Sequence, residues 1–108
     1  MNSNLPISEQ YRLAAKTWVD ADAAANLLEE TKSAVLAQRM NALGDIPVSH
    51  AERTVKASPE WSEFIERMVN ARTAANLAKV KLEWIRMRHM EQTGIEASRR
   101  AEMRLTGT

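Results

Sequence analysis

The 108-residue sequence predicts an all-α protein: an antiparallel helical hairpin of two long helices with a short connecting helix, assembled into a helical-bundle oligomer. Three observations predict this class. Glycine and proline number only three each, while helix-forming residues are abundant. No run alternates β-branched and aromatic residues as a strand does. Two long segments carry apolar residues at spacings of three and four. A chain of this length has room for one domain.

The first helix is expected over residues 8–43, with Ser8 as its N-cap and Gly44 as the residue that ends it. After a loop, Ser49 is followed three residues later by Glu52. This spacing fits a capping box, so it predicts a short helix over 49–57.

The second long helix is expected over residues 59–92. Ser58 is placed to be its N-cap, and Pro59 occupies the first helical position, where a missing N–H costs nothing. Gly94 is expected to end or kink this helix. Residues 95–105 are then read as a further C-terminal helix, with the last residues frayed.

A heptad seam predicts how the two long helices pair. Small residues at its centre let helix backbones approach closely, so it suits a tight antiparallel pair. On the first helix the seam residues are Tyr11, Ala14, Trp18, Ala21, Ala25 and Leu28. On the second they are Trp61, Phe64, Met68, Ala71, Ala75, Ala78, Leu82, Ile85 and His89.

The second long helix also carries an apolar stripe about half a turn away from this seam. Because the first helix can cover only one face, the stripe predicts an interface with another subunit or partner. The alternative is that residues 95–105 fold back over it. The stripe consists of Val69, Thr73, Leu77, Val80, Trp84 and Met87.

Charge differs between the two long helices. Acidic residues from Asp20 to Glu30 face a basic segment from Arg67 to His89, which favours pairing in one orientation. The alternative is that these charges form a solvated face. The basic bias continues to the C-terminus and suggests nucleic-acid binding, with Trp84 either stacking a base or anchoring an interface. The candidate binding residues are Lys79, Lys81, Arg86, Arg88, Arg99 and Arg100.

Nothing in the sequence indicates enzymatic chemistry. There is no cysteine, no paired histidine, no glycine-rich phosphate loop and no nucleophile elbow, so we expect no catalytic residue, no metal and no cofactor. No apolar run is long enough to cross a membrane, and the N-terminus does not resemble a signal peptide. These features lead us to expect a cytoplasmic protein with no membrane partner.

Residues 60–91 resemble a bacteriophage family of small helical recombination mediators, which load a strand-exchange protein onto single-stranded DNA. The shared features are a tryptophan- and acid-rich helix start followed by a long Ala/Leu/Lys/Glu helix that ends in Arg-Met-Arg. The resemblance implies a homo-oligomer of helical hairpins that binds single-stranded DNA through basic residues. Lys79, Lys81, Arg86 and Arg88 are then the first candidates.

The sequence thus supports a non-enzymatic, oligomeric, phage-encoded helical module that binds nucleic acid or a nucleic-acid-processing protein. Its expected partners are copies of itself, with single-stranded DNA or a host or phage protein. Two alternatives stay open. One is a protein-directed adaptor or inhibitor that docks a partner through its apolar helix face. The other is a small virion assembly component.

Overall fold

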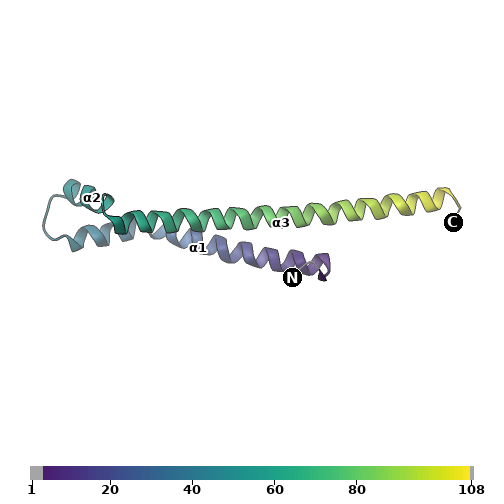
Figure 1. The fold of residues 1–108 in the computed structure, drawn as a ribbon, viewed down its shortest axis with the longest axis horizontal. Helices are drawn as coiled ribbons and strands as arrows, with labels where there is room; N and C mark the ends of the chain where they lie inside the picture. Colours follow the sequence, from purple (N-terminus) through teal and green to yellow (C-terminus); the bar gives the residue numbers. More distant parts are fainter. Residues whose placement is uncertain (1–3, 108) are drawn as a thin grey trace. The chain divides into compact units, whose positions relative to one another are not determined.

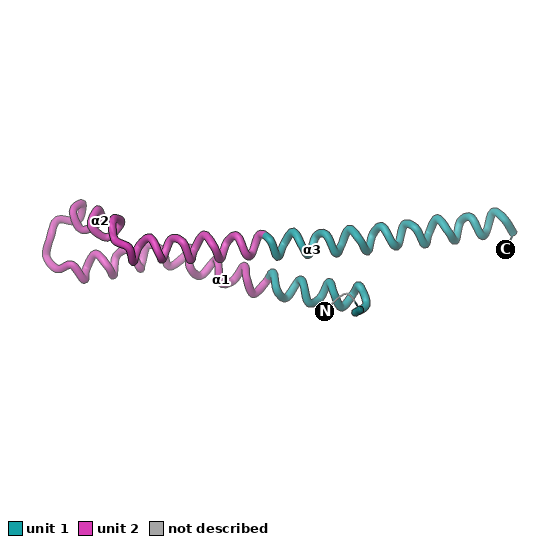
Figure 2. Tube along the Cα trace, viewed as in Figure 1, with its two compact units in different colours: residues 1–18, 77–108 teal, residues 19–76 magenta. Residues whose placement is uncertain are grey.

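The computed structural model describes residues 4–107, and it is all-α over that range. Two long helices, α1 (Ile7–Ala42) and α3 (Pro59–Leu105), are joined by the short helix α2 (Val48–Lys56), as Figure 1 shows. The expected fold class is confirmed in this respect. Two compact units divide the chain: unit 1 holds residues 1–18 and 77–108, and unit 2 holds residues 19–76 (Figure 2).

Unit 2 contains the connecting helix and the main core. Val55 of α2 packs with Trp61 and Phe64 of α3, and all three side chains are buried. The rings of Trp61 and Phe64 stack with their centroids 5.5 Å apart and an angle of 23° between their planes. Around this core lie the half-buried side chains of Leu28, Val35, Leu36, Met40 and Ile65. These contacts set the end of α1 antiparallel to the start of α3.

The small residues of the heptad seam lie at the contact between α1 and α3. Ala25 and Ala75, both in unit 2, are 0% and 1% exposed. In unit 1, Ala14 and Ile85 are buried, and Trp18, Ala78 and Leu82 are half-buried. The remaining seam residues of unit 2 are also half-buried, and they are Ala21, Leu28, Met68 and Ala71. Only the outer ends of the seam, Tyr11 and His89, are exposed.

The helix ends differ in part from the sequence prediction. Ser58 does cap α3, since its hydroxyl accepts a hydrogen bond from the Trp61 backbone N–H at 3.3 Å. Gly44 follows the end of α1 with a φ of 90°, a conformation that favours glycine. The expected N-caps Ser8 and Ser49 are wrong, because both residues lie inside the first turn of their helices.

Backbone carbonyls of proline explain both errors. The carbonyl of Pro6 accepts hydrogen bonds from Glu9 and Gln10, each at 3.0 Å, so α1 begins before Ser8. The carbonyl of Pro47 accepts one from Ala51 at 2.9 Å, and Pro47 is the N-cap of α2 without any side-chain hydrogen bond. Each helix therefore starts one or two residues earlier than its serine suggests.

The expected break at Gly94 is also wrong, since α3 continues through it to Leu105. Gly94 does not have a positive φ. A glycine inside a helix costs only about 1 kcal/mol relative to alanine, and the strong helix formers that follow offset this cost. There is consequently no separate helix over 95–105, and this segment does not fold back over the apolar stripe.

Candidate interaction surfaces

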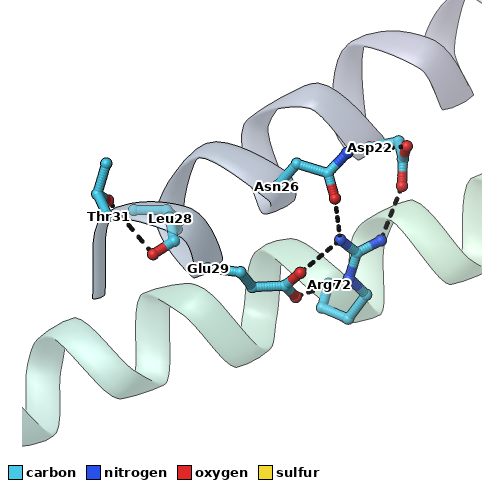
Figure 3. Close-up of polar contacts among 6 residues, drawn as sticks. All are labelled: Asp22, Asn26, Leu28, Glu29, Thr31 and Arg72. Atoms are coloured by element: carbon cyan, nitrogen blue, oxygen red, sulfur yellow. Dashed lines mark hydrogen bonds and ion pairs between the residues drawn. The ribbon is translucent and has the colours of Figure 1, made fainter. Parts of the chain in front are cut away.

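A charged cluster in unit 2 joins α1 to α3 around Arg72 (Figure 3). The Arg72 guanidinium donates two hydrogen bonds of 2.8 Å to the carboxylate of Glu29. It donates two more, each of 2.7 Å, to Asp22 and to the side-chain carbonyl of Asn26. This fork-to-fork geometry with Glu29 is directional as well as attractive. The cluster therefore adds directional contacts that stabilise the register of α1 against α3 beside the small residues of the seam.

The electrostatics of this cluster follow from its hydrogen bonds. The bonds from Arg72 lower the pKa of Glu29 below its ordinary value, and the bonds to Glu29 and Asp22 raise the pKa of Arg72. Arg72 is thus already matched by two carboxylates of its own chain. The sequence predicts acid–base pairing between the two long helices, and in unit 2 this pairing is made by Arg72 with Asp22 and Glu29.

The apolar stripe of α3 is exposed to solvent. In unit 2, Val69 is 53% exposed. In unit 1, Leu77, Val80, Trp84 and Met87 are each between 53% and 66% exposed, although each is a large apolar residue. Such contiguous apolar exposure marks an interaction surface more often than a bare solvent face.

The candidate basic residues all belong to unit 1. This unit holds nine Lys and Arg against five Asp and Glu, a net charge of +4, while unit 2 holds six against nine, a net charge of −3. Within residues 4–107 no carboxylate lies within 4.0 Å of the charged nitrogens of the six candidates, Lys79, Lys81, Arg86, Arg88, Arg99 and Arg100. These cations are therefore available to an anionic partner, unlike Arg72.

Aromatic rings lie beside two of these cations. The guanidinium of Arg88 lies 4.9 Å from the ring centroid of Trp84, and the ammonium of Lys79 lies 5.9 Å from that of Trp18. Trp18 is half-buried in the seam, whereas 53% of Trp84 is exposed. A cation over an aromatic face is stabilised by the ring quadrupole and stays solvated on its other side. Trp84 and Arg88 thus offer an apolar plane and a positive charge at one place.

A shallow notch lies in unit 1 where the seam ends. The apolar side chains of Ile7, Tyr11 and Ile85 line it, together with Ser8, Arg86 and His89. The volume of the notch is about 320 Å³. Among the described residues no group of three or more His, Cys, Asp or Glu could hold a metal ion. Nor does any helix in the described range combine the length and apolar character that crossing a membrane requires.

Comparisons with protein-family models, with curated proteins and with the solved structures find no match for this chain.

Proposed function

We propose that this chain is a non-enzymatic helical module that assembles with copies of itself and binds nucleic acid through the basic residues of unit 1. The observation that carries the proposal is the separation of charge between the units. Unit 1 carries a net charge of +4 and, within the described residues, holds six cations without carboxylate partners next to an exposed apolar stripe, while unit 2 carries a net charge of −3 and its Arg72 is matched by two carboxylates. Phosphate groups are the polyanion that such a surface suits best.

Self-assembly is the second part of the proposal, and it explains why a modest positive charge suffices. Each phosphate contact adds to the affinity, so a cluster of subunits multiplies the contribution of one chain. The apolar stripe supplies the surface for assembly. Its side chains in unit 1 are large, apolar and exposed, and they are Leu77, Val80, Trp84 and Met87. In this arrangement Trp84 is an interface residue, and Lys79 and Arg86 contact phosphate.

The resemblance of residues 60–91 to phage recombination mediators makes single-stranded DNA the first substrate to test. It also supports a cytoplasmic role as a recombination accessory. Positively charged residues that contact the phosphate backbone are one means by which proteins hold single strands without reading their sequence.

The proposal is tested by titrating a labelled single-stranded oligonucleotide at several salt concentrations and measuring fluorescence anisotropy. The Lys79→Gln/Arg86→Gln double variant should weaken binding and reduce the slope of log K against log [salt] by about 1.4, since each single-strand phosphate contact contributes about 0.7. Lys32→Gln/Arg53→Gln is the matched control, because it removes the same charge from exposed positions of unit 2. Absence of salt-dependent binding, or equal losses in both double variants, would refute nucleic-acid binding by unit 1.

A further inference from the structure

The apolar stripe extends along α3 beyond Met87 to the end of the helix. Its members recur at spacings of three or four with a mean near 3.5, which is the period of a coiled-coil seam. We call this set the outer seam. All of its members lie in unit 1 and are exposed, and they are Leu77, Val80, Trp84, Met87, Met90, Gly94, Ala97, Ala101 and Leu105. From Leu77 to Leu105 the helix rises about 42 Å.

The two halves of the outer seam differ in side-chain size. Large side chains occupy the first half, up to Met90. Small residues follow at Gly94, Ala97 and Ala101, and Leu105 at the end of the helix is again large. An antiparallel pair of identical helices centred between Met90 and Glu91 places each half against the other half. Trp84 then lies opposite Ala97 of the second copy, Met87 opposite Gly94, and Val80 opposite Ala101.

A parallel pair in the same register would place identical residues opposite one another. Trp84 would meet a second Trp84, while Gly94 would meet a second Gly94 and leave a void. Close packing without voids is what stabilises a helix interface. The distribution of large and small residues therefore favours the antiparallel arrangement.

Charges beside the outer seam are complementary in the same arrangement. One edge carries Lys81 and Arg88 before the centre, and Glu91 and Glu102 after it. In an antiparallel pair this edge of one helix lies beside the same edge of the other helix. Lys81 therefore lies near Glu102 of the second copy, and Arg88 lies near its Glu91. Two-fold symmetry repeats each pair, as in any isologous interface.

We propose that the outer seam binds the outer seam of a second copy of this chain, antiparallel and centred near Met90. This inference rests on the self-assembly in the proposed function and not on nucleic-acid binding. In this pair Lys79 and Arg86 do not belong to the edge that carries Lys81 and Arg88, so they remain available to phosphate. Charge complementarity and the large-to-small packing select a second copy as the occupant.

Disulfide cross-linking tests the arrangement directly, because the chain has no cysteine of its own. Met90→Cys lies next to the two-fold axis, so it should form a cross-linked dimer on oxidation. Val80→Cys and Ala101→Cys should each remain uncross-linked alone and should cross-link when mixed, since cysteine Cα atoms must lie within about 7 Å. All three positions are exposed in a single chain, so the substitutions leave its core intact.

Two results would overturn the inference. Cross-linking of Val80→Cys alone and of Ala101→Cys alone would show a parallel pair. Absence of cross-linking both in Met90→Cys and in the mixture would show that the outer seam does not pair.

Charge reversal gives an independent readout. Lys81→Glu should weaken the dimer about tenfold, because it replaces two attractive contacts by two repulsive ones. Adding Glu102→Lys should restore the affinity. The two positions lie about 31 Å apart along one helix, so restoration requires contact between chains. A double variant as weak as the single one would contradict the pairing.

These experiments contain no nucleic acid, so their outcome is separate from that of the oligonucleotide titration. Cross-linking as expected with no oligonucleotide binding would refute only the nucleic-acid part of the proposed function. Salt-dependent oligonucleotide binding without cross-linking would refute only the antiparallel pair.

Discussion

Phe64 lies at the centre of the unit 2 core, where 3% of it is exposed and its ring stacks on Trp61. Phe64→Ala removes a whole buried ring, and the surrounding side chains of α1, α2 and α3 can close only part of the cavity. Such truncations cost about 3–5 kcal/mol of unfolding free energy. Because domains of this size have total stabilities of about 5–15 kcal/mol, the variant should lose about a fifth or more of its stability.

Urea unfolding followed by circular dichroism measures this loss. With a slope of about 2 kcal/mol per molar urea, a loss of 4 kcal/mol lowers the midpoint by about 2 M. Both proteins must be compared at one low concentration, because the proposed self-association would stabilise the folded chain. Leu27→Ala is the matched control, since Leu27 lies in α1 of the same unit but is 63% exposed, and it should change stability by less than about 0.5 kcal/mol. Equal effects of the two substitutions would refute the core assignment.

Two further sets of variants test local features of the fold. Glu29→Gln should destabilise the protein at neutral pH, because the pKa of Glu29 is lowered by its hydrogen bonds from Arg72. The stability contributed by this carboxylate is present above its ordinary pKa of 4.5 and is lost as the pH falls through the lowered folded value. The gap between wild type and Glu29→Gln in urea midpoint should therefore narrow towards pH 3, and a gap independent of pH would contradict the role of Arg72. Glycine-to-alanine substitutions should have opposite signs at two positions. Gly44→Ala forces alanine to a φ of 90° and should lower stability by about 1 kcal/mol, whereas Gly94→Ala lies inside α3 with open space around it and should raise stability by about 0.5–1 kcal/mol. Thermal unfolding at a concentration low enough to keep the chain monomeric measures both, and a stabilising Gly44→Ala or a destabilising Gly94→Ala would contradict the described backbone.

Patterns of buried side chains made the fold predictable from the sequence. The seam through Ala25, Ala75 and Ile85 could be read from spacing alone, because a regular helix turns each of its residues by a fixed angle. Helix ends were harder to predict. A serine followed by a glutamate resembles a capping box at Ser49, yet the carbonyl of Pro47 starts the helix earlier. Gly94 resembles a residue that ends a helix, but the strong helix formers that follow it let α3 continue to Leu105.

The sequence indicated the charges that lie between the helices, but not which of them meet. That Arg72 contacts Asp22, Asn26 and Glu29 together depends on the axial register of α1 against α3, which the large side chains of the core determine. The outer seam beyond Met87 was missed for a different reason. The sequence predicts a break at Gly94, so the residues before and after it are assigned to different helices. Their spacing forms one seam only because α3 is a single helix.

The central claim is that the outward face of α3 binds another copy of this chain. Light scattering of the purified chain at roughly tens of micromolar tests it most directly. We expect a mass at least twice the 12.2 kDa of one chain, and a return to one chain's mass in Trp84→Glu, which places a charge in the outer seam. A wild-type chain that stays at 12.2 kDa over this concentration range would contradict the claim.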